Sequence, residues 1–293
     1  MYFQHAAALW RDFPSLVPGV LYAEGITADA APDSDHYSKI ARARLADGPE
    51  SEFPEIQAWR RAFARMGLKP TQYRCAAESL LRRFRKEGSL PRLHPLVDLC
   101  NAVSLAFAVP VAVLDAAEIA WPLEVRYAAG DEDYLTFGGQ TEHPAPGEVI
   151  FADAAGQAHA RRWTNRQSGR SAVSAATGTV LIVAEALHEQ AASDVPELID
   201  TLTAEIGAAW AAQPRTAVLT PANPRFTPPR PPSSSRAYSA SCSARGCPAR
   251  PRKRSAARER TLVTLAPPAP DHKAWMPRSC CSSDVEAASM PYP

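Results

Sequence analysis

The segment ARRWTNRQSGRS, residues 160–171, carries the side chains of this sequence that are best suited to ligand binding. It holds four arginines, one tryptophan, one asparagine and one glutamine, and it lies between two runs that are typical of β-strands. Guanidinium groups bind phosphates and carboxylates through paired hydrogen bonds, and an indole ring can stack on a base. The segment therefore predicts a binding surface for an anionic ligand, with a well-solvated hairpin as the alternative.

A strand through residues 161–166 would divide these side chains between two faces, because successive side chains of a strand point in opposite directions. One face would combine an aromatic plane with guanidinium and amide donors, from Arg161, Trp163 and Asn165. Together with Arg166 and Gln167, and with Asp98 and Asn101 of an apolar stretch described below, these residues form our candidate substrate-binding set. The alternative is cross-strand packing of Trp163 beside solvated arginines.

Two further clusters place polar groups beside apolar ones. The helix expected over residues 74–88 carries four cations, Arg82, Arg83, Arg85 and Lys86, which either follow a nucleic-acid backbone or form a solvated helix face. In the apolar stretch 94–110, Asp98 and Asn101 share one helical face. They form either part of a binding site or an internal hydrogen-bond network.

The common catalytic signatures are absent from the sequence. There is no GxGxxG, GxxxxGK[ST] or GxSxG motif, and Ser168 lacks the preceding glycine of a nucleophile elbow. The six cysteines show no CxxC spacing and the seven histidines no HExxH spacing. We therefore predict neither a metal site nor a cofactor.

The elements that must position these residues follow from hydrophobic periodicity and from glycines. Apolar residues at helical spacing predict helices over 55–67, 74–88, 94–110 and about 194–212, the last with Asp194 and Glu197 as a capping box. A β-branched run predicts a strand over 17–26, and short extended runs separated by glycines follow from residue 122, with a hairpin turn at 152–157. This order predicts an α+β fold with a mixed, largely antiparallel sheet flanked by helices.

Composition changes sharply after Phe226. Residues 227–293 are rich in Pro, Ser and Arg and carry a net charge of +7, so we predict a disordered tail, either an RNA-binding arm or a non-functional extension. The remaining residues carry a net charge of −6. We expect an N-terminal part over 1–69 and a main domain over 70–226. Without a membrane span or signal peptide, we expect a soluble cytoplasmic protein.

Three ordered blocks of the sequence resemble a known family. They are YRCAAESLLRRFRKEGSLPRLHPLVDLCNAVSLAFAVPV (73–111), LTFGGQTEHPAPGEVIFAD (135–153) and RRWTNRQS (161–168). Together they resemble the B3/B4 domain of the phenylalanyl-tRNA synthetase β subunit, a module that also occurs as a freestanding protein. The resemblance implies an α+β fold and tRNA-related activity, since this domain in the synthetase hydrolyses tyrosine wrongly attached to the phenylalanine tRNA.

The sequence departs from the family pattern at two positions. Where the synthetase domain has a His in a P-M-H-A-F-D turn, PVAVLD (110–115) has Ala112. Where it has a Glu in a G-G-E-H-S-G loop, TNRQSG (164–169) has Arg166. Tyrosine editing is therefore not carried over. The resemblance leaves three hypotheses: a deacylase acting in trans on aminoacyl-tRNA, a non-catalytic binder of tRNA or of a free amino acid or small metabolite, and an interaction protein without a ligand.

Overall fold

The computed structural model of the chain describes residues 1–228. Its helices are α1 (Ala7–Asp12), α2 (Asp35–Asp47), α3 (Pro54–Arg65), α4 (Ala76–Glu87), α5 (Pro95–Phe107) and α6 (Ala191–Trp210). Its strands are β1 (Phe3–His5), β2 (Val17–Glu24), β3 (Val111–Asp115), β4 (Leu123–Tyr127), β5 (Tyr134–Leu135), β6 (Thr141–Glu142), β7 (Val149–Asp153), β8 (Ala158–Arg161), β9 (Arg166–Gln167), β10 (Thr179–Ala186), β11 (Arg215–Val218) and β12 (Arg225–Phe226). The predicted tail, 227–293, lies outside the described residues except for its first two positions.

The strands form two main sheets and one short ribbon. The first sheet has the order β12-β1-β4-β7-β8-β9, the second has the order β11-β2-β10-β3, and β5 pairs with β6. Among the ladders of residues 1–228, β1 with β4 is parallel and the other strand pairs are antiparallel. The predicted α+β fold with largely antiparallel strands flanked by helices is confirmed, although the strands are divided between two sheets.

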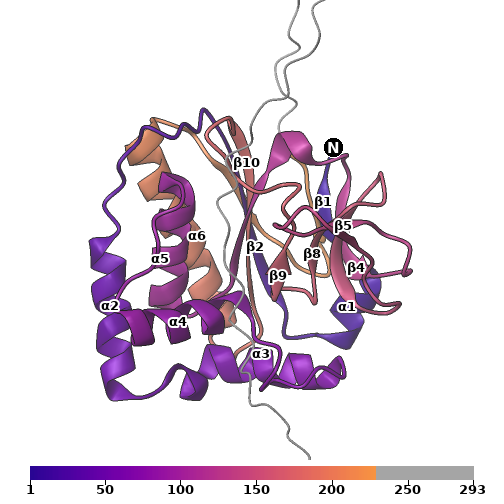
Figure 1. The fold of residues 1–293 in the computed structure, drawn as a ribbon, viewed down its shortest axis with the longest axis horizontal. Helices are drawn as coiled ribbons and strands as arrows, with labels where there is room; N and C mark the ends of the chain where they lie inside the picture. Colours follow the sequence, from indigo (N-terminus) through magenta and orange to yellow (C-terminus); the bar gives the residue numbers. More distant parts are fainter. Residues whose placement is uncertain (229–293) are drawn as a thin grey trace, which may run out of the picture. The chain divides into compact units, whose positions relative to one another are not determined.

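The β11-β2-β10-β3 sheet is the central layer, and its inner strands β2 and β10 are buried on both faces, whereas the edge strand β11 is largely exposed. Alternate residues of its strands belong to different cores: Leu21 and Ile182 pack toward α5 and α6, whereas Val20 and Leu181 pack toward the other sheet. Figure 1 shows this order: α2, α4, α5 and α6 lie on one side of β2 and β10, and the β1-β4-β8 sheet lies with α1 on the other side of β2 and β10. Burial on both faces explains why these strands are apolar at nearly every position.

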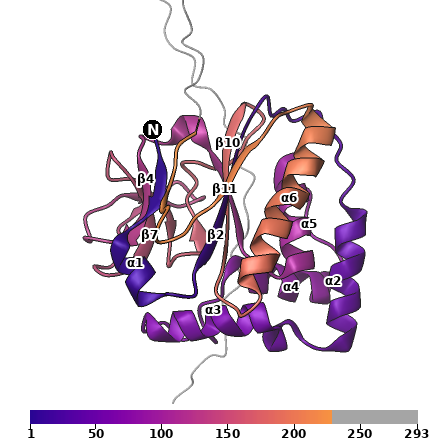
Figure 2. The same ribbon diagram turned by 180° about the vertical axis from the view of Figure 1, so that it is seen from behind.

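Helix α6 packs closely on β2 because one position of the strand is glycine. A Cβ atom on Gly19 would lie 2.5 Å from Ile199 Cγ1 and 2.7 Å from Val195 Cγ1, both on α6. Figure 2 shows α6 alongside β2 and β11 from behind. A side chain at position 19 would push the helix away from the sheet, so the glycine fixes this helix–strand distance.

Most of the predicted elements are present, and two are corrected. The helices expected over 55–67, 74–88 and 94–110 are α3, α4 and α5, and Gly88 ends α4 in the left-handed conformation with φ 76°. The last helix begins at Ala191 rather than near residue 194, so Asp194 lies in its first turn and is not an N-cap. The strand expected through residue 165 ends at Arg161.

The boundary that we expect near residue 69 stays a prediction. Residues 1–228 all fall within one compact unit. Strand β2, from the N-terminal part, pairs with β10 along its whole length. No helix of the described residues is long and apolar enough to cross a membrane.

Candidate functional site

The ARRWTNRQS segment is a hairpin turn rather than a continuous strand. Strand β8 ends at Arg161 and β9 begins at Arg166, and between them Arg162 and Trp163 both have positive φ, 48° and 57°. Two consecutive left-handed residues reverse the chain, so the predicted alternation of side chains over 161–166 is wrong. This conformation was not evident from the sequence, because hairpin turns of this kind usually carry glycine or asparagine at such positions.

The turn directs Trp163 into the core. Its side chain is fully buried at 0% exposure, and its ring meets Phe13 and Trp59 edge-to-face with centroids 4.9 and 5.0 Å apart. Its indole N–H donates to the carboxylate of Glu185 over 2.8 Å. In this conformation the ring presents no face on which a ligand could stack.

Glu185 is a buried residue that accepts hydrogen bonds from several elements, and it was not among the residues predicted from the sequence. Besides Trp163, its Oε1 contacts His5 Nε2 at 2.6 Å, and its backbone carbonyl accepts from the indole of Trp59. The available signal was a single charged residue inside the apolar run GTVLIVAEAL. Through these contacts Glu185 connects β10 with β1, α3 and the β8–β9 turn. A buried carboxylate needs such hydrogen-bond donors to offset its loss of hydration.

Arg161 is held by two carboxylates. Its guanidinium donates to both oxygens of Glu148, at 2.9 and 3.0 Å, and to Glu142 at 2.6 Å. Burial by itself raises the pKa of Glu148, but the hydrogen bonds and charge of Arg161 outweigh it and hold the pKa below its usual value. The donors of Arg161 are therefore directed at protein groups.

The two amides of the segment also bond to the protein backbone. Asn165 Nδ2 donates to the carbonyl of Arg74 at 2.7 Å, and Gln167 Nε2 donates to the carbonyl of Val113 at 2.7 Å. Arg166 differs from its neighbours: its side chain is 43% exposed and lies 3.5 Å from Glu142. Of the five predicted binding residues in this segment, Arg166 is the one whose side chain faces solvent.

The bond from Gln167 brings together the two positions at which the sequence departs from the family pattern. Val113 directly follows Ala112 on β3, and Gln167 directly follows Arg166 on β9. Helix α5, which carries Asn101, packs against β3. We call the region around Asn101, Ala112 and Arg166 the α5–β3–β9 surface. Two segments that are far apart in sequence, α5–β3 and β9, meet there.

The loop after β9 is fixed by short-range contacts. Ser168 Oγ donates to the carbonyl of Leu135, and the Gly169 N–H donates to the same carbonyl at 2.8 Å. A Cβ atom on Gly169 would lie 3.1 Å from the Thr136 carbonyl oxygen, so a glycine suits this close approach. Ser168 is fully buried. Its hydroxyl stabilises the loop, as expected for a turn hydroxyl.

The predicted site residues of α5 are Asp98, in its first turn, and Asn101, at its middle. Asp98 Oδ1 accepts the backbone N–H of Leu93 at 2.9 Å, and His94 Nδ1 accepts that of Leu96 at 3.2 Å, so both side chains order the start of the helix. Burial lowers the pKa of His94 despite the nearby charge of Asp98. Because Nδ1 accepts a hydrogen bond, the proton of the neutral ring lies on Nε2. Asn101 is half-buried on the same helix.

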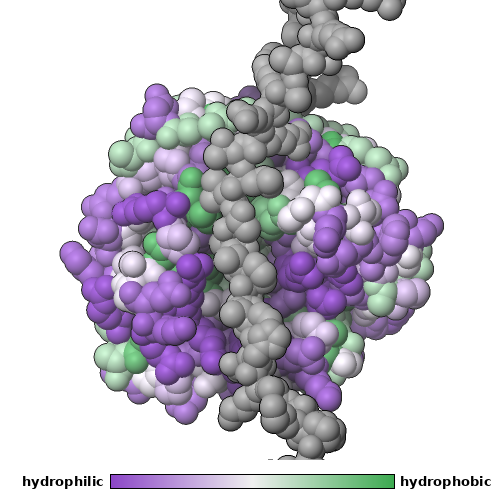
Figure 3. Space-filling model, viewed as in Figure 1, coloured by the Kyte–Doolittle hydropathy of each residue, from purple (hydrophilic) through white to green (hydrophobic). Residues whose placement is uncertain are grey.

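The four cations of α4 divide into two kinds. Arg83 pairs with Glu87 at 2.9 Å and Arg85 pairs with Glu50 at 2.8 Å. Arg82 and Lys86 are exposed and have no ion pair among the described residues. Figure 3 shows that hydrophilic residues predominate on the face over α2 and α4. The structure therefore leaves Arg82 and Lys86 most available to an external phosphate.

Residues 58–196 match the family described as the B3/4 domain. The match runs from α3 into the first turns of α6, and it includes all three blocks that carry the resemblance. The resemblance to the B3/B4 family that the sequence predicts is confirmed.

The matching relatives are phenylalanine–tRNA ligase β subunits. That of Haemophilus influenzae strain 86-028NP is 21% identical over 140 residues, 48% of this chain and 17% of the relative, and that of Pasteurella multocida is 23% identical over the same length and shares. That of Mannheimia succiniciproducens is 34% identical over 64 residues, 22% of this chain and 8% of the relative. The chain thus covers less than a fifth of each of these relatives.

Among solved structures, an N-terminal fragment of the phenylalanyl-tRNA synthetase β subunit from Pyrococcus horikoshii resembles this chain with a TM-score of 0.39 and 11% identity. The resemblance covers 73% of this chain and 50% of that fragment.

Proposed function

We propose that this protein acts in the cytoplasm on aminoacyl-tRNA and hydrolyses wrongly attached amino acids in trans. The observation that carries the proposal is the meeting of two segments that are far apart in sequence, α5–β3 and β9, at the α5–β3–β9 surface, joined by the 2.7 Å bond from Gln167 to Val113. The relatives are subunits of a tRNA ligase, which supports a tRNA-related role. Substrate would reach this surface as the amino-acid end of a tRNA.

Arg166 is the group of this surface that can meet a negative charge. Its exposed guanidinium can bind a phosphate of the tRNA, an acidic side chain of the amino acid, or the oxyanion that develops during ester hydrolysis. The amides of Asn165 and Gln167 already donate to backbone carbonyls, so they position Arg166 rather than bind. Because a cation stands where the synthetase domain has a glutamate, the favoured substrate carries an anionic group rather than a phenol.

Non-catalytic binding of tRNA or of a free amino acid is the second candidate. It is favoured by the shortage of acid–base groups: Ala112 has no titratable side chain, and the carboxylate of Asp98 accepts a backbone hydrogen bond. If the protein does hydrolyse its substrate, the attacking water must be positioned by the substrate and by Arg166 rather than by a general base.

The deacylation test compares a panel of misacylated tRNAs with the full chain and with Arg166→Ala. We expect release of at least one amino acid above the spontaneous rate, and a loss of about 100-fold or more in Arg166→Ala, the size seen when one transition-state donor is removed. Arg215→Ala, an exposed arginine on β11, is the matched control and should retain the rate. Measurable tRNA affinity without turnover for any substrate would favour the binding module, and neither turnover nor affinity would reject both.

The α4 surface gives a separate prediction about RNA. Neutralising Arg82 and Lys86 together should lower tRNA affinity. It should also reduce the slope of log affinity against log salt concentration by the amount that corresponds to about two phosphate contacts, since each contact releases counterions. Neutralising Arg83, which is paired to Glu87, should have the smaller effect. Filter binding across a range of salt concentrations measures both slopes. Identical slopes in all variants would show that α4 does not contact the RNA.

A further inference from the structure

Three potential metal ligands that are remote in sequence meet beside the start of α6. Glu55 lies in the first turn of α3, His188 follows β10, and Asp194 lies in the first turn of α6. One candidate ligand atom from each residue lies within 4.8 Å of the others. His188 Nε2 and Asp194 Oδ2 are 2.8 Å apart. The histidine spacing along the sequence gave no sign of this cluster, because each ligand comes from a different element.

The cluster contains buried polar atoms without a partner among the described residues. Glu55 Oε1 accepts from Arg44 at 2.7 Å, whereas Glu55 Oε2 is buried and unbonded. The side chain of His188 is 3% exposed, and its Nδ1 is likewise buried and unbonded. An unpaired buried carboxylate oxygen costs free energy, so the site favours a cation or donor that would satisfy it.

We propose that Glu55, His188 and Asp194 bind one divalent transition-metal ion, with Zn²⁺ as the best match to one imidazole and two carboxylates. Zinc–ligand distances are about 2.1 Å, so two ligands of one tetrahedral ion lie about 3.4 Å apart. The cluster therefore needs a contraction of at most about 1.4 Å from the 4.8 Å limit, while His188 Nε2 and Asp194 Oδ2 must separate by about 0.6 Å from 2.8 Å. Three protein ligands leave a coordination position for water or for an anionic ligand. This proposal does not depend on the proposed tRNA function.

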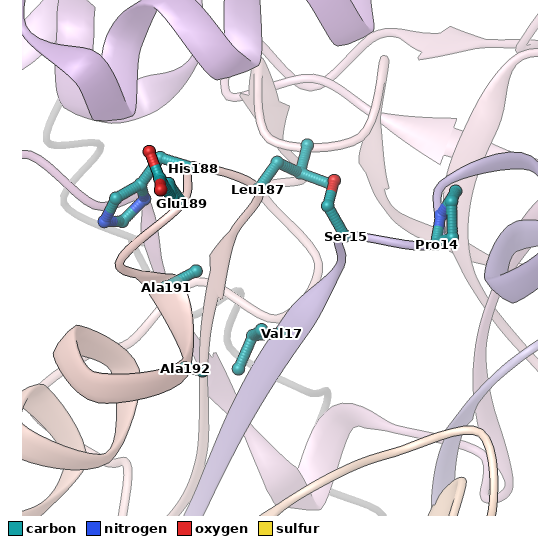
Figure 4. A pocket seen from close by; sticks show the side chains of 8 residues that line it. All are labelled: Pro14, Ser15, Val17, Leu187, His188, Glu189, Ala191 and Ala192. Atoms are coloured by element: carbon teal, nitrogen blue, oxygen red, sulfur yellow. The ribbon is translucent and has the colours of Figure 1, made fainter.

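A pocket adjoins the cluster and gives the ion a route from solvent. It has a volume of about 280 Å³ and includes Ser15, Leu187, His188 and Glu189 in its lining. Figure 4 shows His188 and Glu189 next to each other on the turn between β10 and α6, with Leu187 and Ser15 beside them. The pocket would hold the water or ligand that completes the coordination of the ion.

The charges around the cluster favour a divalent ion on balance. With His188 neutral, the two carboxylates give −2, Arg44 on α2 contributes +1 through its pair with Glu55, and Glu189 at the pocket contributes −1. Arg44 lowers the affinity for a cation, while it also fixes the orientation of the Glu55 carboxylate. Asp194 is oriented in the same way by the hydroxyl of Ser193 at 3.0 Å.

The binding test uses the full chain with Cys242, Cys247, Cys280 and Cys281 replaced by serine, so that thiolates outside the described residues contribute nothing. After dialysis against a chelator, Zn²⁺ is titrated in competition with a chromophoric chelator, and bound metal is measured by atomic emission. We expect one equivalent of Zn²⁺ per chain. We also expect a rise of the melting temperature with Zn²⁺, and Co²⁺ absorption bands typical of nitrogen and oxygen ligands.

Three ligand variants and one control decide the outcome. His188→Ala, Asp194→Asn and Glu55→Gln should each raise the Kd for Zn²⁺ at least 10-fold and abolish the thermal shift, whereas His36→Ala, an exposed histidine on α2, should change neither. The near-isosteric Asp194→Asn and Glu55→Gln keep the test decisive if His188→Ala fails to fold. Equal Zn²⁺ stoichiometry and Kd in all four variants, or no binding by the parent chain, would overturn the proposal.

Discussion

Replacing Trp163 with alanine is expected to lower the free energy of unfolding by about 3–5 kcal/mol, the usual cost of removing a large aromatic side chain from a core. The ring is fully buried and packs edge-to-face on Phe13 and Trp59. The substitution also removes the indole donor from Glu185, which then keeps its contact with His5 at the same oxygen. Loss of packing and loss of a donor to a buried carboxylate act in the same direction.

Urea unfolding followed by far-ultraviolet circular dichroism measures the change. Trp210→Ala is the matched control: its ring is only partly buried and its N–H bonds to the Thr27 carbonyl, so we expect a loss of about 1 kcal/mol. Trp163→Phe should fall between the two. If Trp163→Ala instead left stability unchanged and reduced RNA or amino-acid binding, the ring would be a ligand contact and its burial in the core would be incidental.

Replacing Arg161 with methionine is expected to cost about 3–5 kcal/mol, because it leaves the buried carboxylate of Glu148 without its cation. Glu142 is more exposed, at 36%, so water can solvate it after the substitution. Arg166→Met is the control, since Arg166 is 43% exposed and 3.5 Å from Glu142, and exposed pairs contribute about 0–1 kcal/mol. Urea unfolding of both variants near neutral pH checks the prediction.

The pH dependence of the Arg161 effect follows from the pKa of Glu148. In the wild-type protein this pKa is below its usual value, so the pair stabilises the fold above the unfolded pKa and the stabilisation is lost as pH falls through the folded pKa. In Arg161→Met the hydrogen bonds and charge that lower the pKa of Glu148 are lost while the burial that raises it remains, so the folded pKa of Glu148 should rise. The difference in free energy of unfolding between wild type and Arg161→Met should therefore shrink as the pH falls from the folded pKa of Glu148 in the variant through the lower folded pKa in the wild type.

The double variant Arg161→Met with Glu148→Gln separates the pair from the packing around it. Removing the charge of Glu148 should recover part of the stability lost in Arg161→Met, because no unpaired buried charge remains. A pH-independent difference between wild type and Arg161→Met, with no recovery in the double variant, would show that Arg161 stabilises the fold by packing alone.

Local pattern was sufficient for most of the helices and for the class of fold. Helical spacing of apolar residues predicts α3, α4 and α5, and Gly88 marks the end of α4, because these signals depend on neighbours within a few residues. The short elements β1 and α1, and the polar helix α2, went unpredicted. Strand β1 and helix α1 are too short to show a hydrophobic periodicity, and α2 exposes most of its residues to solvent.

Local pattern failed at the start of α6 for a physical reason. Asp194 followed by Glu197 has the spacing of a capping box, yet Asp194 lies within the helix and bonds to His188. A capping residue lies just before the helix, whereas the turn after β10 brings the chain into the helix three residues earlier, so that Gln190 is the N-cap. The partner that decided the role of Asp194 comes from the end of β10, which the motif does not include.

The sequence by itself determined which side chains were available for chemistry, and it located the three blocks of the B3/B4 resemblance, since residue type and order are local properties. Only the tertiary structure decided what those side chains do. A positive-φ turn buries Trp163, the carboxylates of Glu142 and Glu148 pair with Arg161, and Arg166 stays exposed. The meeting of Glu55, His188 and Asp194 was likewise decided by packing, because α3, β10 and α6 come together only when the central sheet is covered.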